Sequence, residues 1–404
     1  MKLGCCIACL LAGVWTQGAS ADDRVDVVGA LDVRWVHASG ELSYLNGGLG
    51  ITRFDPEHED FRLARAYLAP RLRLTDTLTL HAVIDAYGDH DRNPIDFSEF
   101  WLDLRPFPTN PIRWHVRLGA FHMPVSLENR GAGWSDVYSI TPSALNAWTG
   151  EEFRTIGAEV EARWLGASQG YLGELAIIGA VYAWNDPAGA LIAGRGFALT
   201  DRPSTLFGGL GRPPTTFFHE IDRKPGYYGG LAWRHHDWLE VRALRYDNRA
   251  DPGAATAAGG GAWRTRFSSF GARLEPSAHW TFIAQHMNGD TAVGSNFDAA
   301  EQFLMNYRAA FALASYERGH ERLTVRRDVF GTHQTSGLYG LPSNQTGNAW
   351  TASFTHELSM QWQLAFEWIR AWSRFDPRAE LGLPPALLQS QIQLALRYRF
   401  RFST

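Results

Sequence analysis

Hydrophobic and polar residues alternate along much of the chain, and the C-terminal stretch QIQLALRYRFRFST shows the pattern most clearly. Its even positions are apolar or aromatic: Ile392, Leu394, Leu396, Tyr398, Phe400 and Phe402. Its odd positions carry Gln391, Gln393, Ala395, Arg397, Arg399 and Arg401. Because successive side chains of a strand point to opposite faces, this pattern predicts a strand with one apolar and one polar face.

The same alternation recurs throughout the chain and predicts about sixteen half-buried strands. We expect them at 25–36, 61–74, 77–88, 97–106, 111–121, 154–165, 173–184, 225–236, 238–247, 263–275, 279–288, 303–316, 320–331, 348–358, 361–375 and 388–402. The links between them are alternately short and long. The long links are 122–153, 185–224, 248–262, 289–302, 332–347 and 376–387.

Short turns at one end and long loops at the other are typical of an all-β transmembrane antiparallel β-barrel with extracellular loops and periplasmic turns. A barrel must close in lipid, because an open sheet edge would leave backbone groups without hydrogen bonds. The last strand is therefore expected to pair with the strand at 25–36. The alternative is a soluble β-sandwich, whose strands also alternate. The turn asymmetry and the N-terminal segment favour the barrel and a location in the bacterial outer membrane.

The first 21 residues have the features of a secretory signal peptide. Lys2 precedes an apolar run, and Ala19-Ser20-Ala21 forms a small-residue end. The expected organisation is a signal peptide at 1–21 and one barrel domain at 22–404. The cysteines, Cys5, Cys6 and Cys9, also allow a lipoprotein, but they lie inside the apolar run. A chain beginning at Asp22 has no cysteine, which excludes disulfides, thiol catalysis and zinc–thiolate sites.

Composition narrows the choice of partners. With 38 basic and 42 acidic residues, nothing favours a nucleic-acid partner. Lysine occurs only at Lys2 and Lys224, so almost all positive charge is arginine. Aromatic residues near strand ends fit interfacial girdles: Trp35, Tyr87, Trp101, Trp184, Trp233, Trp238, Trp280 and Trp350.

If the apolar faces meet lipid, the polar faces line a water-filled lumen. They then carry the candidate selectivity residues Arg65, Arg71, Arg73, Arg105, Arg113, Arg117, Arg163, Arg242, Arg326, Arg397, Arg399 and Arg401. Arginine remains charged and binds carboxylate or phosphate well, so such a wall would favour anions. The alternative is that these arginines only pair with wall carboxylates. The three arginines of the last strand are expected to be the least neutralised, near the periplasmic mouth.

The long loop 122–153 could fold into the barrel and narrow it. Its candidate constriction residues are Glu128, Arg130, Asp136, Glu151 and Glu152. The alternative is a loop that caps the barrel from outside.

Residues 60–89 and the stretch IRWHVRLGAFHMPVSLEN at 112–129 resemble outer-membrane porins of the phosphate-selective O/P type. That family carries an arginine-rich early strand and a G-x-F-x-x-P-x-S/G-L-E stretch before its inward loop. The matching residues here are Gly119, Phe121, Pro124, Ser126, Leu127 and Glu128. The resemblance implies a passive diffusion channel. Its phosphate-binding members use lysine clusters, which a chain with Lys224 as its one mature lysine cannot form, so a less selective channel is expected.

No constellation for catalysis, metal or cofactor binding stands out. His235-His236-Asp237 falls on a tight turn, where adjacent side chains diverge. An outer-membrane barrel enzyme would need a Ser/His or Asp/His group near the rim, and none can be assembled. A loop-closed structural or adhesive barrel is the other alternative. Expected partners are membrane lipid, small hydrophilic or anionic solutes, the barrel-assembly machinery through the aromatic last strand, and, by analogy with porins of this size, two further copies in a homotrimer.

Overall fold

The computed structural model describes residues 24–89, 94–208, 217–256, 260–295, 298–337 and 342–404. The described residues form a closed barrel of sixteen antiparallel strands, in which each strand pairs with its neighbours in sequence. The strands are β1 (Val25–Ser39), β2 (Asp60–Arg73), β3 (Leu78–Ala86), β4 (Ile95–Leu104), β5 (Ile112–Phe121), β6 (Thr155–Trp164), β7 (Glu174–Ala183), β8 (Gly226–His235), β9 (Leu239–Asp247), β10 (Arg264–Leu274), β11 (Trp280–Ser295), β12 (Asp298–Arg318), β13 (Glu321–Ser336), β14 (Gln345–Glu357), β15 (Trp362–Phe375) and β16 (Ala386–Ser403). The predicted fold class and strand count are confirmed.

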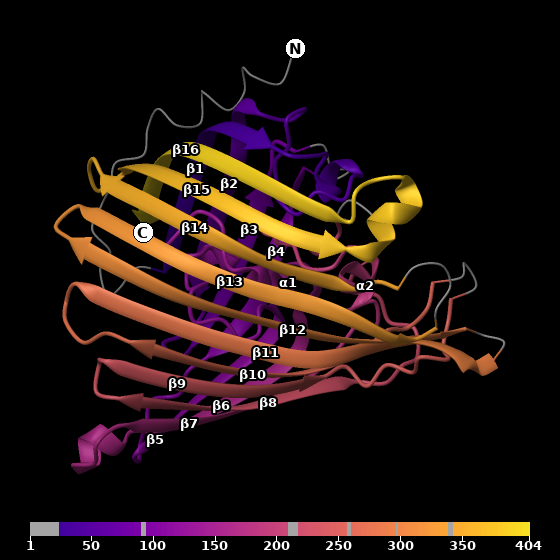
Figure 1. Ribbon diagram of the computed structural model, residues 1–404. Coiled ribbons are helices and arrows are strands. Elements are labelled where there is room, and N and C mark those ends of the chain that lie inside the picture. The colour runs from indigo at the N-terminus through magenta and orange to yellow at the C-terminus, as the bar shows by residue number, and fades with distance from the viewer. Residues whose placement is uncertain (1–23, 90–93, 209–216, 257–259, 296–297, 338–341) are drawn as a thin grey trace.

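The first and last strands close the barrel (Figure 1). β1 and β16 pair from Asp26 opposite Ser403 to Ser39 opposite Ser390. The backbone oxygen of Thr404 also accepts bonds from the N–H groups of Arg24 and Val25, at 2.7 and 3.0 Å. The predicted closing pair is therefore confirmed.

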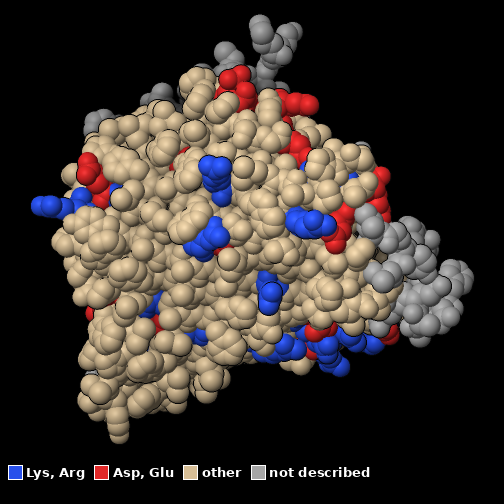
Figure 2. All heavy atoms as spheres, in the orientation of Figure 1, with Lys and Arg blue, Asp and Glu red and all other residues tan. Residues whose placement is uncertain are grey.

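The alternation sorts side chains between the two faces of the wall. On β16, Leu388 and Leu394 are 52% and 48% exposed, whereas Gln391 and Gln393 are fully buried. The exposed set points outward, and most of the outer face seen in Figure 2 is uncharged. Two aromatic residues that we predicted in the girdles point inward instead. Tyr87 is buried, and Trp101 stacks on the inward-facing His81 at 4.7 Å.

The long connections gather at one end of the barrel, the loop end, and the short turns at the other (Figure 1). The predicted loop at 289–302 is wrong, because β11 and β12 extend through most of it. Asp290, on the outward row of β11, falls within this link, and the nearby outward residues His286, Asn288, Asn306 and Arg308 are also polar, so the apolar half of the strand pattern is weak there. The predicted loop 332–347 is also shorter, since β13 runs to Ser336 and β14 starts at Gln345.

Six short helical segments lie in the connections. They are the α-helices α1 (Ala144–Glu152) and α2 (Ala190–Arg195) and the 3-10 helices η1 (Tyr44–Asn46), η2 (Ala132–Trp134), η3 (Gly166–Gln169) and η4 (Asp376–Leu381). No helix of the described ranges is long and apolar enough to cross a membrane. The predicted signal peptide at 1–21 lies outside the described residues.

Candidate channel lumen

Two long loops fold into the barrel. The first, residues 122–154, joins β5 to β6 and contains α1; the second, 184–225, joins β7 to β8 and contains α2, and its described parts are residues 184–208 and 217–225. Every residue of α1 is buried, and the helix packs against β12 and β13 on the opposite wall. The loops therefore occupy part of the lumen.

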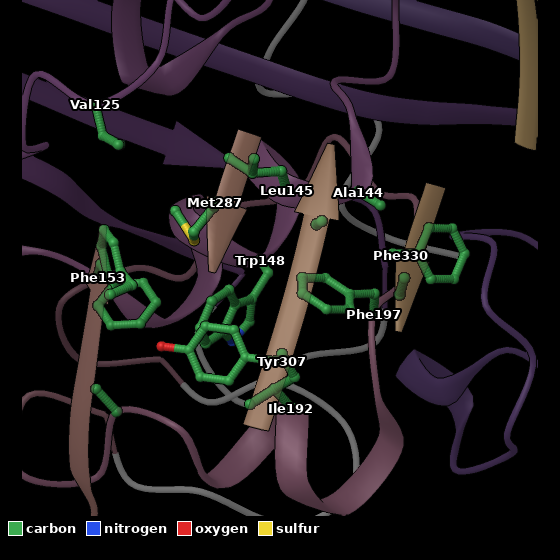
Figure 3. Packing of buried hydrophobic residues seen from close by; sticks show 14 of the residues in the cluster. Val125, Ala144, Leu145, Trp148, Phe153, Ile192, Phe197, Met287, Tyr307 and Phe330 are labelled. Atoms are coloured by element: carbon green, nitrogen blue, oxygen red, sulfur yellow. The ribbon is translucent and has the colours of Figure 1, made fainter. Parts of the chain in front are cut away.

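An apolar core holds these loops inside the barrel (Figure 3). At its centre is the fully buried Trp148 of α1. Its ring lies 4.7 Å from that of Phe153, 5.6 Å from Phe197 of the second loop and 4.8 Å from Tyr307 of β12. The expectation that the inward face meets water throughout is thus wrong for this part of the wall, where aromatic side chains face the loops.

Arg326 of β13 attaches loop 122–154 to the wall. Its fully buried guanidinium donates to the carbonyls of Thr141 and Pro142 at 2.8 and 3.0 Å, and to Ser139 Oγ at 2.9 Å. On its own strand it bonds to Asp328 at 2.9 Å. A single arginine thereby supplies hydrogen bonds to backbone carbonyls in a buried, non-helical segment of the loop.

The same cluster contains more carboxylates than cations. Glu128 and Asp136 of the loop lie 3.6 and 3.7 Å from Arg326, which already pairs with Asp328. Burial raises the pKa of Glu128 and raises that of Asp136 still further, because the Glu128 carboxyl adds to the effect of burial. Arg326 opposes both shifts without cancelling them. We refer to Arg326, Asp328, Glu128 and Asp136 as the latch.

The second loop is fixed by Asp201. Its carboxylate accepts bonds from Arg34 of β1 at 2.6 Å and from Arg53 of the β1–β2 loop at 2.9 Å. Burial by itself raises the pKa of Asp201, but the two guanidinium groups outweigh burial and hold it below its ordinary range. Arg34 also bonds to Asp32 at 2.8 Å, and Arg53 bonds to Asp89 at 2.9 Å. This group, the Asp201 clasp, ties two loops to the wall.

Gly119 lies in β5, three residues before the first loop begins. Its φ is +130°, and a Cβ there would lie 2.4 Å from the backbone oxygen of Phe100. Only glycine fits this position without distortion. The glycine of the sequence motif therefore has a structural role in the strand that leads into the inward loop.

A cavity of about 900 Å³ occupies the short-turn half of the lumen. Residues 122–132 of the first loop line it on the inner side, and β1–β5, β9 and β16 contribute the wall. Eight arginines border it: Arg24, Arg71, Arg73, Arg105, Arg117, Arg130, Arg242 and Arg401. Four carboxylates border it: Asp26, Glu99, Asp103 and Glu240. We call this cavity the vestibule, and its wall has an excess of positive charge.

A smaller cavity of about 310 Å³ lies beside the vestibule and is nearly balanced in charge. Its arginines are Arg34, Arg65, Arg322, Arg397 and Arg399, and its carboxylates are Asp32, Asp136, Asp201 and Glu357. The Asp201 clasp forms part of its lining.

The arginines that we predicted on the inner wall are mostly paired. The ion pairs are Arg65–Asp85 at 2.6 Å, Arg71–Asp26 at 4.0 Å, Arg105–Asp103 at 3.0 Å, Arg117–Glu159 at 2.7 Å, Arg163–Glu161 at 2.8 Å and Arg242–Glu240. Arg73 lines the vestibule. Arg113 is exposed, opposite Arg163, and forms no ion pair within the described ranges.

The last strand departs from expectation. We expected its arginines to be the least neutralised, but each has a carboxylate partner. Arg397 bonds to Asp32 at 2.8 Å, Arg401 bonds to Asp26 at 2.7 Å, and Arg399 bonds to Glu357. The reason is that the neighbouring strands place acids on the same inward rows.

Of the five loop residues predicted at a constriction, Arg130 borders the vestibule, and Asp136 borders the smaller cavity. Glu128 belongs to the latch. Glu151 and Glu152 are buried between the loops, where Glu151 bonds to Arg195 and Tyr44, and Glu152 accepts the N–H of Leu191 at 2.8 Å. Burial raises the pKa of Glu152 to about 7.

The sequence analysis did not identify the Asp201 clasp. Asp201 and Arg53 lie in loops, where no periodicity assigns a direction to a side chain. Arg34 could have been found, because Asp32 and Arg34 alternate with the apolar residues of β1. The two histidines that bond to Asp103, His81 and His115, also alternate on their strands and were not singled out.

Three carboxylates of the second loop, Asp186, Glu220 and Asp222, have oxygen atoms within 4.8 Å of one another. Asp186 already accepts the backbone N–H groups of Ile221 and Asp222 at 2.6 and 3.1 Å. These bonds account for the position of Asp186 as part of the loop fold.

Comparisons with known proteins place this fold. No protein-family model and no curated protein sequence matches the chain. Solved structures do match, although sequence identity is low. An anion-selective porin from Comamonas acidovorans is 12% identical, with a TM-score of 0.53 over 93% of this chain and 99% of that one. The outer membrane channel DcaP of Acinetobacter baumannii is 10% identical, with a TM-score of 0.55 over 93% and 96%.

A structure of Salmonella typhi OmpF gives 10% identity and a TM-score of 0.54, over 94% of this chain and 98% of that one. These likenesses concern the fold, which is that of outer-membrane porins and channels. Together with the closed barrel and its apolar outer face, they place the chain in the bacterial outer membrane. The loop end then faces outward and the short-turn end faces the periplasm.

Proposed function

We propose that this protein is a passive diffusion channel for small hydrophilic solutes and that its vestibule favours anions. The observation that carries the proposal is the charge of the vestibule, where eight arginines face four carboxylates. An excess of fixed positive charge in a confined aqueous space lowers the cost of anion entry and raises that of cations. The fold that the chain shares with porins supports the channel role.

An arginine that pairs with a wall carboxylate adds little to this preference, because the carboxylate cancels most of its charge. Arg24 and Arg130 form no ion pair among the described residues, so their charges face the cavity without local compensation. We therefore assign the anion preference first to these two residues. Arg117 and Arg242, each held by a carboxylate, act mainly as part of the wall.

The proposal extends the resemblance to O/P-type porins without adopting phosphate specificity. The vestibule contains arginines and no lysine. A cavity lined by paired arginines favours anions in general, because most of its bidentate donors are already occupied by wall carboxylates. We include in the proposal a homotrimer, recognition of the aromatic β16 by barrel-assembly machinery, and the absence of a catalytic step.

A second candidate function rests on the apolar core inside the barrel. Loops that are held by Trp148, the latch and the Asp201 clasp could keep the barrel closed, as in a structural or adhesive barrel. Conductance distinguishes the two functions.

The test is current through the purified protein in a planar bilayer under a KCl gradient. We expect open-channel currents and a reversal potential on the anion side. Arg24→Gln combined with Arg130→Gln should move the reversal potential towards that of an unselective pore. Arg370→Gln, an exposed arginine on the outward face of β15, is the matched control and should leave it unchanged. Cation preference in the unmodified protein would refute the anion bias, and silence at all voltages would favour the closed barrel.

A further inference from the structure

The outer face of the barrel is not uniform. Most outward positions are large and apolar, but a sector formed by β9–β12 is polar on its loop side. Cross-strand register places Arg245, Ser268, Asn288 and Arg308 side by side in one row over these four strands. Figure 2 shows basic groups scattered over an otherwise mostly uncharged outer face.

The row lies near the outer edge of the membrane. Tyr316 of β12 packs on Trp280 at 4.9 Å, close to the short turns, and marks the periplasmic interface. Arg308 lies eight residues before Tyr316 on β12, towards the loop end. This spacing is roughly 26 Å along a strand and about 20 Å in height at the usual tilt. The apolar band of such barrels is about 25 Å tall. The backbone of the row therefore lies about 5 Å below the top of this band, from where arginine side chains reach the outer-leaflet head groups.

The charges of the row lack protein partners. Arg308 is exposed and forms no hydrogen bond or ion pair with any described residue. Arg245, also exposed, donates only to Ser268 Oγ at 3.1 Å. The carboxylates of the next row, Asp247 and Asp290, flank Arg266, which bonds to Asp290 at 2.8 Å. An arginine near the edge of the hydrocarbon costs little by itself, and an anion in the head-group region adds a charge-assisted bond to it.

Small side chains lie below the β12 end of the row. Towards the periplasm, the outward row of β12 continues with Ala310, Ala312 and Ala314, and that of β11 continues with His286, Ala284 and Phe282. Elsewhere, as on β16, comparable positions are leucines that are 48% and 40% exposed. This alanine sector of β12 leaves room for acyl chains against the wall, beneath the Arg308 end of the row.

We propose that the row from Arg245 to Arg308, with the alanine sector below it, binds a phosphate-bearing lipid of the outer leaflet. Its phosphate groups meet the arginines, Asn288 donates to a phosphate or sugar oxygen, and the acyl chains cover the alanines. This site depends on the position of the barrel in the membrane and is independent of the solute that the channel passes.

A second copy of this chain fits the row less well than a lipid. An arginine-bearing face needs an acidic face opposite it, and the described outward positions of β1–β8 carry no carboxylate. A symmetric contact through the row itself would place arginine against arginine. A lipid phosphate supplies the missing charge.

Native mass spectrometry of the full-length protein in detergent, with diphosphoryl lipid A as the probe, tests the proposal. We expect one lipid to bind. Arg245→Gln combined with Arg308→Gln should weaken binding by roughly 10-fold or more, the usual effect of losing charge-assisted bonds. Ala312→Phe, which fills the alanine sector and keeps the charges, should also weaken it. Arg370→Gln is the control, because Arg370 lies between Trp368 and Trp372 on the outward face and has no alanine sector beneath it.

Four results would overturn the proposal. The first is unchanged lipid binding by the double variant. The second is an equal loss in Arg370→Gln, which would mean that any outward arginine suffices. The third is a change in the mass of the protein assembly in the double variant, which would assign the row to a contact between copies. Complete competition by inorganic phosphate would likewise assign the row to free anions. A change in gel mobility between unheated and heated samples confirms that each variant is folded.

Discussion

Removing the Asp201 carboxylate should loosen the loops that narrow the lumen. Asp201→Ala deletes two charge-assisted bonds, to Arg34 and Arg53, at 2.6 and 2.9 Å. Bonds to charged groups contribute about 1.5–3 kcal/mol each when one partner is removed. Both arginines keep other partners, Asp32 and Asp89, so the lower end applies and the loss is about 3 kcal/mol. At 1.4 kcal/mol per factor of ten, the detached state of the loop becomes roughly 100-fold more populated.

Single-channel recording detects this change. We expect Asp201→Ala to increase conductance or the fraction of time spent in a larger open state, and to expose loop 184–225 to added protease. Asp376→Ala is the control, because Asp376 lies outside both inward loops and bonds to Arg374 at 3.3 Å. The pKa of Asp201 is lowered in the folded protein, so the clasp is fully formed above the ordinary Asp pKa and is lost only as pH falls below it. Wild-type conductance together with wild-type protease protection in Asp201→Ala would refute the reasoning.

Two further predictions concern the buried loop helix α1. Glu152→Gln keeps an acceptor for the Leu191 N–H. Because the pKa of Glu152 is raised to about 7, ionisation of the native carboxyl above that pH lowers the free energy of unfolding by about 3 kcal/mol. The variant should therefore raise the thermal unfolding midpoint at pH 8 and not at pH 4, and an equal shift at both values would contradict this. Trp148→Ala should weaken loop packing by roughly 3–5 kcal/mol and increase protease cleavage of residues 122–154, with an unchanged far-ultraviolet circular dichroism spectrum. Full protection of the loop in this variant would show that the latch alone holds it.

The wall was predictable because its signal is local. A period of two, with apolar residues outward, identified all sixteen strands and the pairing of β1 with β16. The prediction failed where the outward face itself is polar. The outward row of β11 continues past Asn288 with Asp290, and the facing row of β12 carries Asn306 and Arg308. The apolar half of the pattern was therefore weak, and the end of the hairpin of β11 and β12, at 289–302, was taken for a loop.

The interior was less predictable, because it depends on contacts between distant segments. Inward aromatic residues such as Tyr246, Phe267 and Tyr307 follow the strand period as arginines do, but only the loops that they contact explain them. Likewise, nothing in the sequence of the last strand shows that Asp26, Asp32 and Glu357 would neutralise its arginines. Pair formation across a barrel depends on register, which alternation alone leaves open.

The seam between β1 and β16 has a consequence for how the protein is made. It joins Asp26 to Arg401, 375 positions apart, and its ladder runs to the last residue, Thr404, whose N–H bonds to the Val25 oxygen at 2.9 Å. Closing a segment of this length costs about 5 kcal/mol of chain entropy. Until synthesis and export have delivered β16, β1 has one edge without a partner. The earliest strand therefore waits longest for its second neighbour.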